Sequence, residues 1–92
     1  MLLAIDVGNT NFVLALGSET DGGLANAGYR IETASVTDAG SCEAAIRHLL
    51  GDLVNEIADA VIASVVPEVT PVLAEAVTRI TRTAPLVVGE LG

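Results

Sequence analysis

The sequence contains no lysine, and its only cationic side chains other than a single histidine are four arginines. It also contains twelve Asp and Glu residues, so the formal net charge of the 92 residues is −8 at pH 7. A nucleic-acid interface requires clustered cations that face the phosphate backbone, and a Walker-type P-loop requires a lysine. The composition therefore excludes a P-loop and argues against nucleic acid as a partner.

Aromatic residues, cysteine and long apolar runs are scarce as well. Aromatic residues make up 2% of the chain and hydrophobic residues 51%, so the core must consist of Val, Leu, Ile and Ala, as in the buried sheets of α/β proteins. No run reaches the eighteen or so apolar residues of a membrane span, and we see no basic leader with a cleavage signal. Cys42 has no second cysteine for an internal disulfide, which agrees with a reducing compartment. We therefore expect a soluble cytoplasmic protein with no membrane partner.

The chain begins with two apolar runs that flank a polar insert. Leu2–Asp6 and Phe12–Gly17 are predicted strands, and the insert contains Gly and Asn, which tolerate the positive φ that tight hairpin turns require. Such a turn exposes backbone N–H groups, and the small side chains at Gly8 and Thr10 would let a phosphate approach them. Asp6 could hold a cation against that phosphate. A solvated turn without a ligand explains the same residues equally well, because Asn, Asp and Gly are common in turns.

The pattern changes from strands to a helix in the middle of the chain. The polar segment Ser18–Gly23 should turn the chain back into a third, half-exposed strand at Ala27–Thr33, where apolar and polar residues alternate. We expect Ala34–Gly40 to be irregular. Apolar residues then recur at helical spacing, so Ser41–Ile57 is predicted to be an amphipathic helix of about four turns with Ser41 as its N-cap.

Two side chains on this predicted helix have reactive chemistry. Cys42 lies on the apolar stripe, and buried cysteines mostly behave as small hydrophobic residues, so a core thiol is favoured over a nucleophile. His48 lies on the polar face, with no second histidine and no nearby cysteine to complete a metal site. We therefore expect His48 to be a surface residue rather than a metal ligand.

The last part of the chain completes an α/β pattern. Ala58–Val66 is a continuous apolar run rich in β-branched residues, which predicts a strand buried on both faces, and the helical connection before it predicts parallel pairing. Thr70-Pro71 indicates the start of a helix over Thr70–Thr81, with Thr70 as its N-cap. Leu86–Val88 can add a short last strand. The order β-β-β-α-β-α-β predicts one α/β domain over residues 1–92.

Three segments of the chain form a further pattern: LLAIDVGNTN at residues 2–11, VIASVVP at 61–67 leading into Thr70-Pro71, and PLVVG at 85–89. Together they resemble the type III pantothenate kinases, which are members of the acetate and sugar kinase, Hsp70 and actin superfamily. DxGNTN followed by SVVP is a specific pair of motifs, and the resemblance spans the whole chain in order. It implies a ribonuclease-H-like, actin-like ATPase lobe, with a mixed five-stranded sheet in the order 3-2-1-4-5 and strand 1 central. Ala34–Gly40 departs from the family, because Asp38 is its only charged residue.

The resemblance also implies a function. The family phosphorylates pantothenate to 4′-phosphopantothenate in coenzyme A biosynthesis, with ATP bound between two lobes. The resemblance further implies that the first hairpin binds the phosphates of ATP through Asp6, Val7, Gly8, Asn9, Thr10, Asn11, Phe12 and Val13.

Several parts of the family's active site are not visible in this sequence. They are the general base, the Gly-Ala-Asp-Arg-type segment that contacts pantothenate, the ligands of a monovalent cation (K⁺ or NH₄⁺) and much of the homodimer interface. No catalytic residue is therefore identified here. We expect these residues to be the first lobe of such a kinase, able to bind nucleotide but not to turn over, and to expose an apolar face where a second lobe docks. A catalytically silent regulator of the Bvg accessory factor type, or a bare nucleotide-binding module, would carry the same motifs.

We expect Asp6 to act through a divalent cation. No Lys or Arg precedes Arg30, so nothing cationic in the hairpin can neutralise a triphosphate. A bare carboxylate about 5 Å from a phosphate charge would be repelled by roughly 3 kcal/mol at an effective dielectric near 20. Mg²⁺ held by Asp6, partly through water, would turn this repulsion into attraction, while Asn9 and Asn11 fix the turn and donate to phosphate. The alternative is that Asp6 only caps the turn by accepting from the Gly8 amide.

Overall fold

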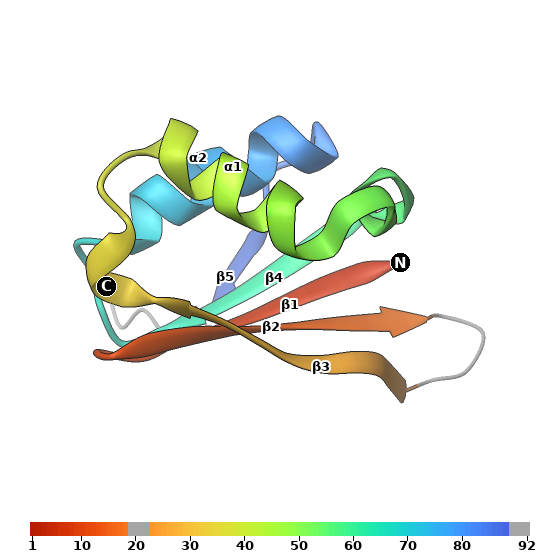
Figure 1. Ribbon diagram of the computed structural model, residues 1–92, viewed down its shortest axis with the longest axis horizontal. Helices are drawn as coiled ribbons and strands as arrows, with labels where there is room; N and C mark the ends of the chain where they lie inside the picture. Colours follow the sequence, from red (N-terminus) through yellow and green to blue (C-terminus); the bar gives the residue numbers. More distant parts are fainter. Residues whose placement is uncertain (19–22, 89–92) are drawn as a thin grey trace.

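A mixed five-stranded sheet with two helices packed on one face forms the fold (Figure 1). The computed structural model describes residues 1–18 and 23–88. In chain order the elements are β1 (Leu2–Val7), β2 (Asn11–Ser18), β3 (Gly23–Glu32), the 3₁₀ turn η1 (Thr33–Ser35), α1 (Ala39–Leu50), the 3₁₀ helix η2 (Gly51–Glu56), β4 (Asp59–Ser64), α2 (Thr70–Thr81) and β5 (Leu86–Val88). The predicted order of strands and main helices is confirmed.

The central strand of the sheet is β1. The strands lie in the order β3-β2-β1-β4-β5, which confirms the order 3-2-1-4-5. β1 pairs antiparallel with β2 and parallel with β4, and β4 pairs parallel with β5. Because β1 and β4 run in the same direction, their carboxyl ends meet at one edge of the sheet, beside the turn that joins β1 to β2. Asp6 lies at this end of β1, as predicted.

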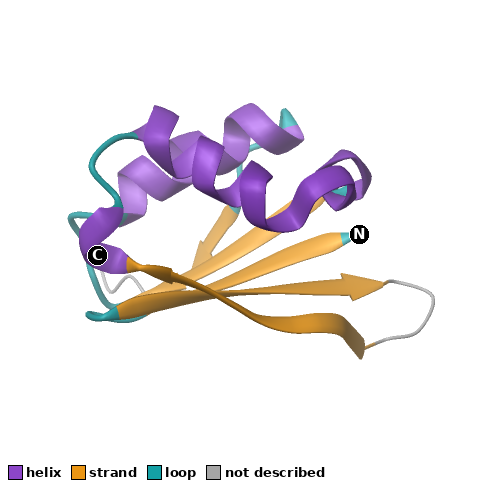
Figure 2. Ribbon diagram, in the orientation of Figure 1, coloured by secondary structure: helices purple, strands orange, loops and turns teal. Residues whose placement is uncertain are grey.

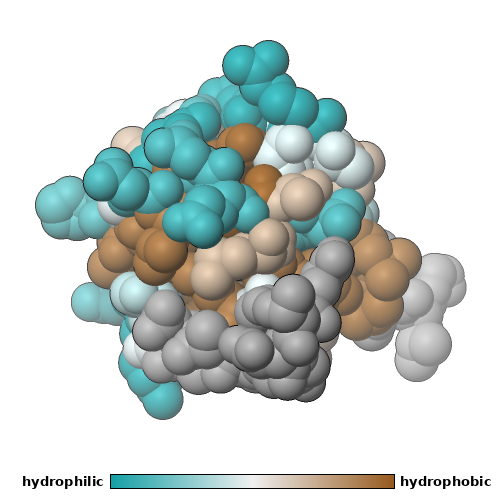
Figure 3. Space-filling model, turned by 90° about the vertical axis from the view of Figure 1, so that its right-hand side faces the viewer, coloured by the Kyte–Doolittle hydropathy of each residue, from teal (hydrophilic) through white to brown (hydrophobic). Residues whose placement is uncertain are grey.

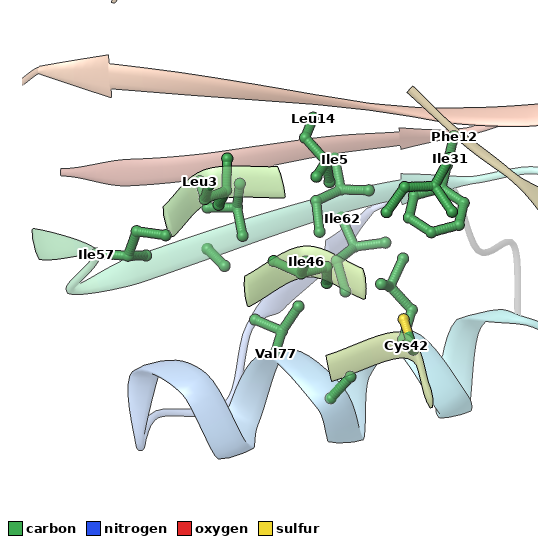
Figure 4. Packing of buried hydrophobic residues seen from close by; sticks show 14 of the residues in the cluster. Leu3, Ile5, Phe12, Leu14, Ile31, Cys42, Ile46, Ile57, Ile62 and Val77 are labelled. Atoms are coloured by element: carbon green, nitrogen blue, oxygen red, sulfur yellow. The ribbon is translucent and has the colours of Figure 1, made fainter. Parts of the chain in front are cut away.

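The hydrophobic core lies between the sheet and the two helices. Alternate residues of the strands face the helices, and Ile5 of β1 and Ile62 of β4 are at most 2% exposed. Ile46 of α1 lies between Ile62 and Val77 of α2 (Figure 4). Full burial of an aliphatic side chain stabilises a fold by about 1.5–3 kcal/mol, so this aliphatic layer holds both helices to the sheet.

The opposite face of the sheet carries no helix in the described part of the chain (Figure 2). The prediction that Ala58–Val66 is a strand buried on both faces is therefore wrong: β4 spans Asp59–Ser64, and its inner residues alternate between buried and half-buried. Helix α1 connects β3 to β4, and α2 connects β4 to β5. Both connections join parallel strands and run in the same direction across the sheet, so crossovers of the same hand place α1 and α2 on the same side. On the uncovered face, Leu86 and Val88 of β5 are 65% and 41% exposed.

Helix α1 begins earlier and ends sooner than the predicted Ser41–Ile57. Its N-cap is Asp38, whose carboxylate accepts a hydrogen bond of 2.7 Å from the amide of Ser41. Ser41 is the third helical residue and completes a capping box with its own hydroxyl, so it is not the N-cap. Gly51 ends the α-helix with a φ of 59°, a conformation that glycine adopts at low cost, and the chain continues as η2.

Smaller shifts occur at β3 and α2. The third strand spans Gly23–Glu32 rather than Ala27–Thr33, because Thr33 begins η1; η1 and the start of α1 also replace much of the segment expected to be irregular. The predicted loop Ser18–Gly23 falls mostly on residues 19–22, which lie outside the described residues. In α2 the N-cap is Val69 rather than Thr70, because the Thr70 amide already donates to the Val66 carbonyl four residues back. No helix in residues 1–18 and 23–88 is long and apolar enough to cross a membrane.

The outer surface of the helical layer is polar. Arg79 of α2 lies 3.7 Å from Glu43 of α1 and 3.1 Å from Glu75 of its own helix. Exposed ion pairs of this kind contribute about 1 kcal/mol at most. Figure 3, which views the end of the molecule remote from the β1–β2 turn, shows hydrophilic residues gathered over the helices. His48 is exposed on α1, which confirms its predicted surface position.

Candidate functional site

The residues singled out in the sequence gather at the carboxyl edge of the parallel strands. Figure 1 shows that the β1–β2 turn, the end of β4 and the first turns of α1 and α2 lie at the same end of the molecule. The amide of Val65, just after β4, donates to the carbonyl of Val7 at the end of β1 over 3.2 Å, which joins the two strand ends. Ligands of open α/β sheets commonly bind at this edge.

The β1–β2 turn has free backbone donors at its tip. The Gly8 amide donates to the Asn11 carbonyl over 2.9 Å, whereas the amides of Asn9 and Thr10 donate to no oxygen of the described residues. The side chains of Asn9 and Thr10 are exposed. Two adjacent N–H groups that face solvent can donate only to a ligand or to water, so this tip is suited to binding an anion.

The backbone of this turn differs from the expected one. No residue from Gly8 to Asn11 has a positive φ, so the prediction of a turn that requires positive φ is wrong. The Gly8 carbonyl accepts a hydrogen bond from Thr33, a residue outside the hairpin, and this external support replaces the pairing of a tight two-residue turn. Glycine is needed at position 8 for another reason: a Cβ there would lie 3.2 Å from the Asn11 carbonyl oxygen.

Asp6 lies on the uncovered face of the sheet, between Val13 of β2 and Ala63 of β4 in the strand register. Its side chain is exposed, and it forms no ion pair with the described residues. The alternative in which Asp6 caps the turn is not the observed arrangement, because the Gly8 amide donates to Asn11. Its carboxylate is therefore accessible to a hydrated cation.

A shallow hollow on the uncovered face includes Asp6. Its volume is about 320 Å³, and it is lined by Ala4, Ile5, Asp6, Val13, Ala15, Val61 and Ala63. Of the other predicted phosphate-binding residues, Val7 and Phe12 bury their side chains in the core, and both pair within the sheet together with Val13. The exposed turn residues, rather than these three strand residues, are thus the accessible donors.

The second sequence motif, around Ser64, forms a structural connection. The Ser64 hydroxyl is buried; it accepts from the Val66 amide over 3.0 Å and donates to the Val66 carbonyl over 3.3 Å. The Thr70 hydroxyl donates to the same carbonyl over 3.2 Å. These hydroxyls fix the bend from β4 into α2.

Arg30 brings a positive charge onto the same face as Asp6. Arg30 pairs with Val13, and Val13 pairs with Asp6, so the three side chains share one row across the sheet. Neighbouring strands lie about 4.8 Å apart, which places the Cα atoms of Arg30 and Asp6 about 10 Å from each other. The β1–β2 hairpin contains no cationic side chain, as the sequence indicates, but β3 contributes the cationic side chain of Arg30 to the same face of the sheet.

The described residues include one thiol, that of Cys42, and carboxylate and imidazole side chains of the types that bind metals. Cys42 is 1% exposed, and burial raises the pKa of its thiol to about 11, which confirms a core thiol rather than a nucleophile. No group of three or more His, Cys, Asp or Glu side chains could hold a metal within residues 1–18 and 23–88. Asp6 therefore offers a cation a single carboxylate.

Sequence reasoning missed Thr33 as well as Arg30. Thr33 is buried, and it contacts both the Gly8 and the Thr10 carbonyls of the turn. The alternation of Tyr29, Ile31 and Thr33 placed its side chain on the inner face, and a hydroxyl at such a position needs a partner. That requirement was a signal, but it does not identify a partner 25 residues away.

Comparisons with known proteins identify the family of the chain and similar folds. The family model described as type III pantothenate kinase matches residues 2–92. A type III pantothenate kinase from Moorella thermoacetica is 43% identical over 91 residues, which cover 97% of this chain and 35% of that protein. The crystal structure of a proposed N-acetylglucosamine kinase from Porphyromonas gingivalis superposes with a TM-score of 0.62 at 17% identity, over 95% of this chain and 33% of that one.

These matches differ in what they establish. The structural match has low identity and supports the fold alone. The chain spans about a third of the length of the curated relative, so the match does not extend to that relative's whole activity. The family model covers nearly every residue, including the β1–β2 turn and the Ser64 connection. The chain therefore belongs to the type III pantothenate kinase family.

Proposed function

We propose that residues 1–92 form the nucleotide-binding lobe of a type III pantothenate kinase. The whole enzyme would transfer the γ-phosphate of ATP to pantothenate in the cytoplasm, giving 4′-phosphopantothenate for coenzyme A biosynthesis. The observation that carries the proposal is the β1–β2 turn, where the amides of Asn9 and Thr10 have no acceptor among the described residues and lie close in sequence to Asp6. Backbone amides grouped in this way commonly bind phosphate.

The donor set at this edge suits Mg²⁺. Mg²⁺ usually takes one or two carboxylates from a protein, keeps several waters and obtains its other ligands from substrate phosphates. Asp6 offers one exposed carboxylate, and its neighbours across the sheet, Val13 and Ala63, are small enough to leave space for a hydrated ion. When bound, Mg²⁺ would neutralise part of the phosphate charge. Asp6 would hold the cation, and the turn amides would orient the phosphates.

The remaining parts of the reaction would come from outside these residues. Phosphoryl transfer depends mainly on positioning and charge stabilisation, so a lobe that binds ATP alone contributes only part of the rate enhancement. We assign the general base, the pantothenate-binding segment, the monovalent cation (K⁺ or NH₄⁺) and the homodimer contacts to the two-thirds of the relatives that this chain does not span. A silent regulator of the Bvg accessory factor type would use the same turn, but the family match favours the kinase.

The purified 92-residue chain is expected to bind Mg·ATP without forming 4′-phosphopantothenate. Titration calorimetry with ATP and, separately, with pantothenate measures binding, and mass spectrometry of a mixture of both detects product. Heat on adding ATP, no heat on adding pantothenate and no product would support the proposal. Product formation would contradict the assignment of the base to another lobe, and the absence of ATP binding would contradict the nucleotide site itself.

A further inference from the structure

Thr33 connects the nucleotide-binding turn to a separate part of the sheet. It is the first residue of η1 and is 6% exposed, one of the few buried polar residues in the described chain. Its hydroxyl donates to the Gly8 carbonyl over 2.8 Å, and its amide donates to the Thr10 carbonyl over 2.9 Å. One residue thus holds the carbonyl groups on both sides of Asn9.

The two carbonyls determine where the neighbouring amides point. A trans peptide unit is planar, and its C=O and N–H groups point in opposite directions. All peptide bonds of the described residues are trans. When Thr33 holds the Gly8 carbonyl, the N–H of Asn9 must therefore point away from Thr33, and the Thr10 carbonyl fixes the N–H of Asn11 in the same way. The Asn9 amide is one of the two that have no acceptor among the described residues.

Thr33 is itself held firmly. Its carbonyl accepts from the Val36 amide over 3.2 Å, which closes η1, and the Ser35 hydroxyl donates to the Glu32 carbonyl over 2.7 Å. Ile31, two residues earlier, is 8% exposed in the hydrophobic core. The two hydrogen bonds from Thr33 to the Gly8 and Thr10 carbonyls, here called the clamp, therefore start from a well-anchored residue. They set the position of the turn relative to η1.

The other buried hydroxyls at this end of the sheet act differently. Ser64 and Thr70 donate within their own connection, to a carbonyl two and four residues away, whereas Thr33 donates to a carbonyl 25 residues away. Local bonds of the first kind stabilise a bend. The long-range bond of Thr33 sets the position of one loop relative to another segment.

We infer that Thr33 is a positioning residue for phosphate binding: its hydroxyl and amide orient the turn so that the Asn9 amide faces the phosphates of a nucleoside triphosphate. This inference rests on the proposed nucleotide-binding function. It adds a residue that does not itself touch the ligand and acts only through the Gly8 and Thr10 carbonyls.

Three variants test this role. Thr33→Val removes the hydroxyl but keeps the side-chain shape and the backbone amide, and Thr33→Ser restores the donor. Thr70→Val is the matched control, because it removes another buried hydroxyl that donates to a carbonyl, at 3.2 Å, without contact to the turn. Calorimetry gives the affinity for Mg·ATP, thermal unfolding gives the stability, and ¹⁵N NMR of the ligand-free chain reports on the Asn9 amide.

Thr33→Val should weaken Mg·ATP binding about tenfold, the factor that corresponds to one hydrogen bond of ordinary strength, and should shift the Asn9 amide signal before any ligand is added. Thr33→Ser should restore both properties. Thr70→Val should lower the melting temperature while leaving affinity and the Asn9 signal unchanged. Native affinity in Thr33→Val, or an equal loss in Thr70→Val, would overturn the inference.

The outcome is separable from failure of the proposed function. If the native chain does not bind ATP, the nucleotide site is wrong, but the Asn9 signal in the ligand-free variants still tests the clamp. If Thr33→Val does not fold, Thr33→Ser carries the test: native affinity and a native Asn9 signal support the inference, and loss of either despite the retained donor overturns it.

Discussion

Asp6→Asn is expected to remove most of the Mg²⁺ dependence of ATP binding while leaving the fold intact. Asparagine keeps the shape of the side chain but lacks the charge that attracts a divalent cation. The Coulomb energy between a carboxylate and a phosphate about 5 Å apart is roughly 3 kcal/mol at an effective dielectric of about 20, and solvent exposure of Asp6 reduces it. We therefore expect ATP affinity to fall about tenfold with Mg²⁺ present and to rise slightly without it.

The matched control is Asp59→Asn. Asp59 is also exposed, and it pairs with Leu2 at the opposite end of β1, so its replacement changes the net charge equally but far from the turn. Calorimetric titrations with and without Mg²⁺, at constant ionic strength, measure the effect, and circular dichroism checks the fold. Native Mg²⁺ dependence in Asp6→Asn, or an equal loss in Asp59→Asn, would show that Asp6 is not the cation ligand.

Ile46→Ala is expected to destabilise the chain more than any surface change. Ile46 is fully buried in the middle of α1, between the sheet and α2. Replacing such a residue by alanine typically costs about 2–5 kcal/mol, because apolar contacts are lost and a cavity remains. A domain of this size is stable by about 5–14 kcal/mol, so the variant should unfold at a much lower urea concentration.

His48→Ala is the control for this prediction, because His48 lies exposed two residues away on the same helix. Surface substitutions of this kind usually change stability by less than about 0.5 kcal/mol. Urea unfolding followed by circular dichroism measures both variants. Equal midpoints for Ile46→Ala and His48→Ala would mean that α1 does not pack on the sheet as described.

Periodicity predicted the elements well, but it could not resolve features that depend on tertiary structure. The helical spacing from Cys42 onward was clear, yet Asp38 and Ser41 are both good N-caps, and only the capping box distinguishes them. The apolar run of β4 has the composition of a strand buried on both faces. Whether a helix covers the second face depends on the direction in which successive strands are added, which composition does not record.

The contiguous part of the candidate site was predictable from sequence, and the part that depends on tertiary structure was not. The motif at Asp6 to Asn11 is contiguous, so sequence alone was enough to place a turn with free amides beside a carboxylate. Arg30 of β3 comes to the site through strand register, and Thr33 of η1 through one long-range hydrogen bond. Contacts between residues so far apart in the chain become apparent only when the sheet is assembled.

The central claim is that the tip of the β1–β2 turn binds the phosphates of ATP, and amide NMR tests it most directly. Titration of the ¹⁵N-labelled chain with Mg·ATP should shift the amide signals of Gly8, Asn9, Thr10 and Asn11 most, with little change in the Cys42 and Ile46 amides of α1. The shifts should saturate, and they should be much weaker in Asp6→Asn at the same ATP concentration. Saturable shifts centred elsewhere, with the Asn9 and Thr10 signals unmoved, would contradict the account.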